Sequence, residues 1–263
     1  GRCVDSMLVS EVLDKLEIII VNDGSKDETL SIANNYKQKY PNSIIIIDKP
    51  NGHYGSCVNE ALKVATGKYF RIVDADDWVD SESFKKMIVT ALVTDVDVFF
   101  TKCMDCDFKI NQQIPRKYTD IIYDTILDLN EYRVPECLLS MHSLTYRTQL
   151  LKDINYKQTE GICYTDTEYV CFPMCQARTL YAMNIFLYQY SATQLYIYSI
   201  IFCRRNKERE TKNRYLLSDI KEKNKEAFDI IINIKAKNFI PYIKIWYYHP
   251  ILSYVLRCGK LFL

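Results

Sequence analysis

The sequence has no long apolar run, no internal repeat and almost no net charge, and each absence removes a class of protein. No segment reaches the roughly eighteen uninterrupted apolar residues that a membrane-spanning helix needs. Residues 1–20 have neither the basic start nor the apolar core of a secretory signal, so we expect a cytoplasmic protein. The formal net charge is +1, the surplus of basic residues is confined to the tail, and no nucleic-acid-binding motif accompanies it. These observations argue against a nucleic-acid-binding protein.

The cysteines, in contrast, are numerous. Ten are scattered through the 263 residues without an even framework, as expected for reduced thiols inside the cell. Cys103 and Cys106 have the spacing of half a zinc site, and Cys171 and Cys175 could supply two more thiols. Nothing in the sequence brings the two pairs together, so zinc is the weaker interpretation.

Apolar runs alternate with amphipathic segments through the first hundred residues. Predicted strands cover residues 17–21, 43–47, 69–73 and 96–101, and predicted helices cover 1–16, 27–36, 56–65 and 82–92. Weaker signals follow as helices at 135–140, 148–153, 165–175 and 207–235 and a strand at 179–190. The alternation predicts an α/β fold with a mostly parallel sheet flanked by helices.

The predicted strand at 69–73 ends in three carboxylates, Asp74, Asp76 and Asp77. In open α/β sheets, ligands bind at the carboxyl ends of strands. Carboxylates crowded there repel one another unless a hard divalent cation shares the site. The alternative is a plain turn followed by a helix cap near Ser81, since aspartate is a common cap.

Three segments in order resemble family 2 glycosyltransferases: IIIVNDGSKDET (18–29), KPNGHYGSCVNEAL (49–62) and KYFRIVDADDWVD (68–80). Two later segments, MHSLTYRTQLL (141–151) and EGICYTDTEYVCFP (160–173), resemble the acceptor half of those enzymes. The resemblance implies a Rossmann-like GT-A fold and the transfer of a sugar from a nucleotide diphosphate donor with inversion. The implied donor is a UDP-sugar, and the implied acceptor is a glycan, a lipid-linked molecule or a glycoconjugate in polysaccharide assembly.

The resemblance also assigns roles on the donor side. Asp23 matches the position that contacts the uracil base of the donor. Its alternative role is an Asx turn that shapes the loop. Asn51, Gly52 and Gly55 would bring backbone close to the diphosphate, although glycine loops also serve simple chain reversal. Asp74 would face the ribose, and Asp76 would bind Mg²⁺ or Mn²⁺, which stabilises the departing UDP.

On the acceptor side, inversion in one displacement needs a base that takes the proton of the acceptor hydroxyl. Asp166 matches the family's catalytic carboxylate, with Glu168 as the competing candidate. His142 could contact the acceptor or a phosphate, but a lone histidine is more often a packed, hydrogen-bonded residue. Asp77 is interpreted as a helix cap or a partner of the metal site.

Two departures from the family favour an alternative function, a catalytically impaired or noncatalytic relative that acts as a binding protein. The strand that normally opens the domain in mid-sheet is missing, so we expect a truncated domain with exposed backbone. The segment at 191–199 lacks the glycine and arginine that close over the diphosphate, leaving Arg204 or Arg205 as substitutes.

We therefore expect two regions. Residues 1–200 would form the truncated GT-A-like domain, with a nucleotide half at about 1–105 and an acceptor half at about 106–200. Residues 201–263 have 14 Lys/Arg against 6 Asp/Glu and would form a basic, mainly helical extension. Its end, 237–263, would pack on the domain, with peripheral contact at the inner face of the membrane as the alternative.

Overall fold

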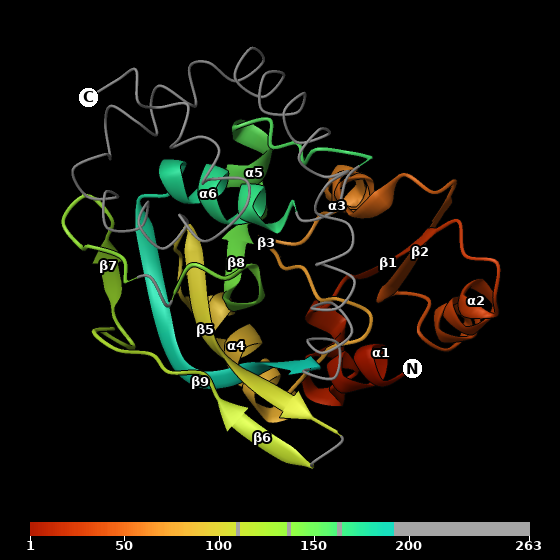
Figure 1. Cartoon of the computed structure of the whole chain (residues 1–263), viewed down its shortest axis with the longest axis horizontal. Coiled ribbons are helices and arrows are strands. Elements are labelled where there is room, and N and C mark those ends of the chain that lie inside the picture. The colour runs from red at the N-terminus through yellow and green to blue at the C-terminus, as the bar shows by residue number, and fades with distance from the viewer. Residues whose placement is uncertain (109–110, 136–137, 162–164, 192–263) are drawn as a thin grey trace, which may run out of the picture. The chain divides into compact units, whose positions relative to one another are not determined.

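The computed structural model describes residues 1–108, 111–135, 138–161 and 165–191 (Figure 1). Its helices are α1 (Arg2–Met7), the 3₁₀-helix η1 (Ser10–Lys15), α2 (Thr29–Lys39), α3 (His53–Val64), α4 (Ser81–Val93), the 3₁₀-helix η3 (Met141–Ser143), α5 (Thr148–Asp153) and α6 (Asp166–Gln176). Its strands are β1 (Ile18–Asp23), β2 (Ile44–Lys49), β3 (Tyr69–Phe70), β4 (Trp78–Val79), β5 (Val98–Asp107), β6 (Gln112–Pro115), β7 (Ile126–Asp128), β8 (Leu144–Arg147) and β9 (Thr179–Ser191).

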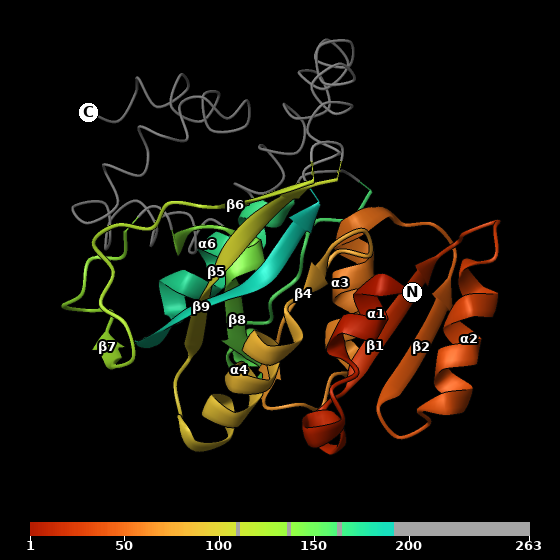
Figure 2. The ribbon, with the colours of Figure 1, turned by 90° about the horizontal axis from the view of Figure 1, so that it is seen from below.

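The described strands form two separate sheets. β1 and β2 pair in parallel, from Ile18 opposite Ile44 to Asp23 opposite Lys49, and make a sheet of their own. The larger sheet has seven strands in the order β3-β8-β5-β9-β4, with β6 added to β5 and β7 to β9. Figure 2 shows β1 and β2 next to α2, apart from the larger sheet. Among the described strands, β1 thus has a ladder partner on one side only.

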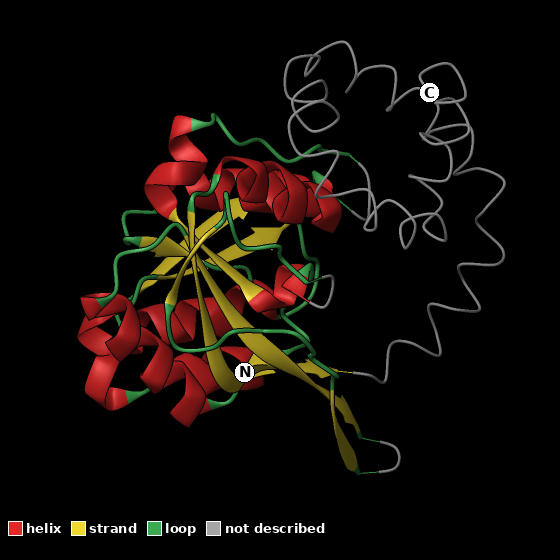
Figure 3. Ribbon diagram, turned by 90° about the vertical axis from the view of Figure 1, so that its left-hand side faces the viewer, coloured by secondary structure: helices red, strands yellow, loops and turns green. Residues whose placement is uncertain are grey.

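The predicted α/β class is confirmed, with helices on both sides of a central sheet (Figure 3). The strand directions are more mixed than the expected mostly parallel sheet. β5 and β9 are parallel, whereas β3, β6, β7, β8 and β4 each pair antiparallel with a neighbour. The β5–β6 connection is too short for the crossover that a parallel pair requires.

Two predicted elements differ in extent. The helix expected over residues 1–16 is interrupted, because Val9 adopts an extended conformation between α1 and η1. The strand expected at 69–73 pairs only at Tyr69 and Phe70, opposite Arg147 and Tyr146 of β8. The next residue, Arg71, directs its guanidinium to side chains of β5 and β8. The predicted helix at 207–235, the segment 192–199 and the tail lie outside the described residues, as does part of 135–140.

Strand β5 separates two hydrophobic cores, as the alternation of side chains along a strand requires. Phe100 packs in the larger core with residues of α3, β8 and α6. Its neighbour Phe99 packs in the smaller core, where Phe84 and Met87 of α4 meet Leu187 of β9. Within the described residues, no helix is both long and apolar enough to cross a membrane.

Candidate active site

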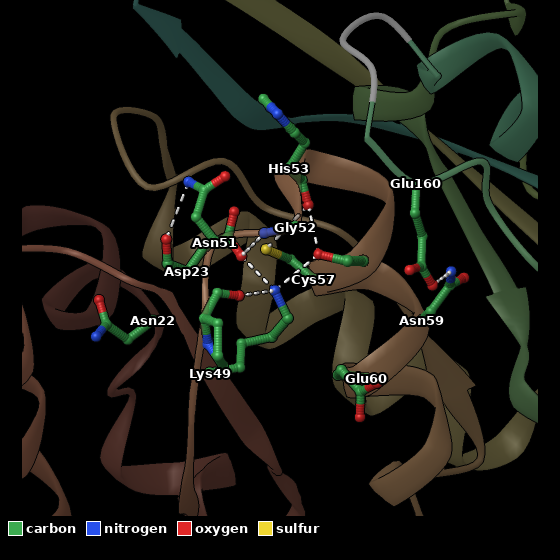
Figure 4. A network of polar contacts seen from close by, with 12 residues as sticks. Asn22, Asp23, Lys49, Asn51, Gly52, His53, Cys57, Asn59, Glu60 and Glu160 are labelled. Carbon is green, nitrogen blue, oxygen red and sulfur yellow. Dashed lines mark hydrogen bonds and ion pairs between the residues drawn. The ribbon is translucent and has the colours of Figure 1, made fainter.

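The carboxylate of Asp23, at the end of β1, is held in a compact polar cluster that Figure 4 shows. Asp23 forms an ion pair with Lys49 and accepts a hydrogen bond at 2.9 Å from the N–H of Gly52. Lys49 also donates to Ser56 Oγ at 2.7 Å, and Asn51 Nδ2 donates to the Asp23 carbonyl at 3.1 Å. We call these five residues the Asp23 network. Although burial opposes ionisation, Lys49 and Gly52 lower the pKa of the Asp23 carboxyl.

The turn after Asp23 depends on a glycine. Gly24 has φ of 72°, and a Cβ atom there would lie 2.9 Å from the backbone nitrogen of Asn51. Glycine therefore allows both the left-handed conformation and the close approach of the two loops. Just before Asp23, the buried Asn22 donates through Nδ2 to Asp48 at 2.7 Å, while its Oδ1 is buried and has no hydrogen-bond partner within the described structure.

Asp74 begins the turn between β3 and β4, and side chains from three other elements hold it. The hydroxyl of Tyr54, from α3, donates to Asp74 Oδ1 at 3.0 Å. The Nε2 atom of His142, from η3, lies 3.4 Å from Asp74 Oδ2. The hydroxyl of Tyr188, from β9, accepts from the Asp74 N–H at 3.2 Å. The carboxylate is therefore fixed by the fold and not by the short β3–β4 connection alone.

Asp77 is buried at the other end of this turn, with 2% of its surface exposed. Its carboxylate accepts hydrogen bonds from the Tyr188 hydroxyl at 2.6 Å and from the Ser191 N–H at 2.7 Å. Burial raises the pKa of Asp77. The cap of α4 is Asp80, which accepts from the Ser83 N–H at 2.9 Å, so the expectation that Asp77 caps this helix was wrong.

The chemistry of these side chains fits a divalent cation. Asp74, Asp77 and His142 each offer a ligand atom, and these atoms all lie within 4.8 Å of one another. Two carboxylates with one imidazole suit Mn²⁺ better than Mg²⁺, which prefers oxygen ligands. Asp76, the predicted metal ligand, is exposed and outside this group, and its carbonyl accepts from Arg2 at 2.7 Å.

A half-buried arginine holds the backbone of His142. Arg71 Nη1 donates to Thr145 Oγ1 at 2.8 Å and to Thr101 Oγ1 at 3.3 Å, and its Nη2 donates to the carbonyl of His142. Burial lowers the pKa of Arg71. Its Nε is buried without a partner in the described part of the chain. The guanidinium thus fixes the backbone that carries the imidazole.

The two acceptor-side candidates differ in their surroundings. Both carboxylate oxygens of Glu168 are engaged at 2.7 Å by Thr159, through its N–H and its hydroxyl, and burial raises the Glu168 pKa. Asp166 begins α6, and its Oδ1 is buried with no hydrogen-bond partner among the described residues. Its charge contributes to the raised pKa of Tyr54, the residue that also contacts Asp74. Glu168 therefore holds a loop, whereas one carboxylate oxygen of Asp166 has no hydrogen-bond partner among the described residues.

The weaker interpretation, a zinc site of four cysteines, has no cluster to support it among the described residues. No cysteine belongs to a group of three or more metal-ligating side chains in the described ranges. Cys103 and Cys106 are buried on β5, where Cys103 Sγ lies 3.2 Å from Ser143 Oγ. Cys171 and Cys175 lie on α6. These thiols are packing residues of the fold.

The sequence did not identify the residues whose side chains contact the acidic groups of the site. Lys49 and Tyr54 both lie within the segment 49–62, but neither residue type nor spacing marks them as site residues. Tyr188 lies in a strand of alternating aromatic residues, which carries no signal beyond packing. His142 was interpreted as packed, and the structure places it beside Asp74.

The mixed sheet resembles that of solved glycosyltransferases. Residues 1–349 of S. aureus TarS in complex with UDP superpose with a TM-score of 0.59 and 21% identity, over 76% of this chain and 58% of that one. The UDP-GlcNAc complex of the same protein gives 0.56 and 22% identity, over 73% and 55%. The protein therefore has the GT-A glycosyltransferase fold.

The family model for Glycosyl transferase family 2 matches residues 1–154, more than half of the sequence, and the chain belongs to this family. The YibD glycosyltransferase of Escherichia coli K12 is 38% identical over 96 residues, which are 36% of this chain and 27% of YibD. The poly(ribitol-phosphate) beta-glucosyltransferase of Bacillus spizizenii is 44% identical over 86 residues, 32% of this chain and 13% of that protein. The chondroitin synthase of Pasteurella multocida is 42% identical over 82 residues, 31% and 8% respectively. The matched segments thus span less than a third of each relative.

Proposed function

We propose that this protein transfers a hexose from a UDP-sugar to a glycan or glycoconjugate acceptor, with inversion at the anomeric carbon and with the help of a divalent cation. The family and the glycosyltransferase fold support sugar transfer. UDP as the carrier is proposed because TarS, of the same fold, has been crystallised with UDP and UDP-GlcNAc. A glycan or wall-polymer acceptor is proposed from the names of the poly(ribitol-phosphate) and chondroitin relatives.

The observation that carries the proposal is the position of the first turn of α3. Its Gly52 N–H binds Asp23, and its Tyr54 hydroxyl binds Asp74. The same tyrosine experiences the charge of Asp166. The groups expected to contact base, ribose and acceptor are thus gathered around one helical turn.

In the proposed reaction, the acceptor oxygen bonds to the anomeric carbon as the bond from that carbon to the UDP oxygen breaks. Asp166 receives the proton of the acceptor hydroxyl, for which its buried, unpartnered Oδ1 is suited. Asp23 would accept hydrogen bonds from the base, and Asp74 from the ribose. Asn51 and Gly52 would lie along the diphosphate. A divalent cation would be held either by Asp76 or by the group of Asp74, Asp77 and His142. When bound there, it would neutralise charge on the leaving diphosphate.

The test is UDP release from a panel of UDP-sugars in the presence of Mn²⁺, with Asp166→Asn as the variant. We expect a fall in kcat of about a hundredfold or more, as for loss of a general base, with little change in UDP affinity. Glu82→Gln is the matched control, because Glu82 is also an acidic residue in the first turn of a helix. Asp166→Asn turnover equal to the wild type would remove Asp166 from the mechanism.

A second function, a noncatalytic nucleotide-binding protein, is favoured by one feature of the site. Lys49 already forms an ion pair with the carboxylate of Asp23. The uracil base of a bound nucleotide must therefore share this carboxylate with Lys49 or displace Lys49 from it. UDP binding without any release of UDP from UDP-sugars would support this candidate.

We also retain the proposed division of the chain, with a glycosyltransferase domain over residues 1–200 and a basic extension over 201–263. Peripheral membrane contact through the tail is testable by co-sedimentation with anionic and neutral vesicles. Equal recovery in the supernatant with both vesicle types would rule it out.

A further inference from the structure

The first turn of α3 contacts each part of the proposed site within four consecutive residues. Gly52 donates its N–H to Asp23, and Tyr54 donates its hydroxyl to Asp74. Gly55 approaches the next loop so closely that a Cβ atom would lie 2.0 Å from the carbonyl oxygen of Thr159. Thr159 in turn holds Glu168, in the same first turn of α6 as Asp166. The turn therefore links the donor side with the acceptor side.

Tyr54 is the member of this turn whose side chain contacts the site. Its ring packs against the larger hydrophobic core, and its hydroxyl reaches Asp74 Oδ1 at 3.0 Å and Met141 Sδ at 3.5 Å. Burial and then the charge of Asp74 raise the pKa of this hydroxyl, so it stays protonated and remains a donor. With Oδ1 held by Tyr54 and Oδ2 facing His142, the orientation of the Asp74 carboxylate is determined on both sides.

We propose that Tyr54 is a positioning residue for the nucleotide-sugar: its hydroxyl fixes the Asp74 carboxylate in the orientation that receives the donor. This inference rests on the proposed function, in which Asp74 binds the donor ribose. Tyr54 acts through Asp74, so its contribution requires that Asp74 carry a charge and accept the hydrogen bond. The alternative is a tyrosine that packs against the core, for which the hydroxyl is incidental.

The test is the substitution Tyr54→Phe, which keeps the packed ring and removes the oxygen. We expect the dissociation constant of UDP in the presence of Mn²⁺ to rise about tenfold, as for loss of one hydrogen bond to a charged group. The KM for the UDP-sugar should rise in parallel, and the urea midpoint of unfolding should fall modestly, because the same hydrogen bond is present in the free protein. A purely structural residue would lower the midpoint and leave UDP affinity unchanged.

Tyr36→Phe is the matched control, because the Tyr36 hydroxyl donates to the carboxylate of Asp5 at 2.7 Å and so forms a second tyrosine–aspartate pair. It should leave UDP affinity at the wild-type value. The double variant Tyr54→Phe with Asp74→Asn should bind UDP as Asp74→Asn alone does, since the hydroxyl acts through that carboxylate.

The outcomes separate the inference from the proposed function. Wild-type affinity in Tyr54→Phe, or a full further tenfold loss in the Asp74→Asn background, overturns the positioning role while leaving the UDP site in place. Failure of the wild-type chain to bind UDP with Mn²⁺ overturns the proposed function and the positioning role together.

Discussion

Replacing Gly55 by alanine tests whether the donor side and the acceptor side of the site meet as closely as the structure shows. The added Cβ would lie 2.0 Å from the Thr159 oxygen, 2.8 Å from its carbonyl carbon and 3.3 Å from the oxygen of Gln158. Backbone lies on both sides of the contact, so one segment must move by more than an ångström. Overpacking of this kind costs about 1–3 kcal/mol.

An approach of 2.0 Å to backbone belongs at the upper end of that range, and alanine improves helix propensity by up to about 1 kcal/mol relative to glycine, so the net loss should be about 2 kcal/mol. For a domain of this size, that loss lowers Tm by roughly 4–8 °C. The assay is thermal and urea unfolding of Gly55→Ala beside Gly67→Ala, whose Cβ would meet its nearest atom, the Tyr69 oxygen, at 3.6 Å.

Gly67→Ala should lie within about 0.5 kcal/mol of the wild type, as substitutions in open space do. Gly55→Ala should also lower kcat, because a displaced Thr159 loop moves the turn that carries Asp166. A Gly55→Ala protein as stable and active as the wild type would refute the close approach of α3 to this loop.

Three further predictions concern ionisation and capping. Asp23→Asn should lose stability at pH 7, and this loss should shrink as the pH falls from 3.8 through the lowered pKa of Asp23, because the stabilisation is present above the ordinary value of 3.8 and lost below the folded value; urea titrations at pH 7 and well below pH 3.8 check this, and an equal loss at both would contradict it. Glu168→Gln should behave in the opposite sense, because the raised pKa of Glu168 stabilises the folded state fully below the ordinary value of 4.5 and progressively less as pH rises. The wild type should therefore lose stability relative to the variant between pH 4.5 and 7.5, and a constant difference in unfolding free energy would contradict this. Asp80→Ala should cost about 1 kcal/mol of unfolding free energy through loss of the α4 cap, with unchanged UDP affinity, and a value near zero would remove the capping role.

Much of the fold could be predicted from periodicity, because local patterns determine local elements. The runs around Ile18–Asp23 and Ile44–Lys49 are short, apolar and bounded by turn residues, and both form strands. The strand at Tyr69–Phe70 is shorter than its apolar run, because pairing with β8 is a tertiary contact that no local pattern records. Strand direction was predicted less well, since short connections and distant pairings decide it.

The acidic site residues could be named from motif order, but their partners could not. Asp74 is visible as a carboxylate at a strand end, whereas the Tyr54 hydroxyl reaches it from twenty residues earlier. His142 lies sixty-eight positions away and was interpreted as a packing residue. Such contacts depend on how helices cross the sheet, so the sequence pattern predicts the acids and the fold supplies the groups that orient them.

The most direct test of the central claim, that Asp23 and Asp74 bind one nucleotide, is calorimetric titration of UDP into the full chain with and without Mn²⁺. The account predicts metal-dependent binding with one site per chain, weakened at least tenfold in Asp23→Ala and in Asp74→Asn, and unchanged in the exposed control Asp95→Asn. Absence of metal-dependent heat in the wild type, or full affinity in both site variants, would contradict it.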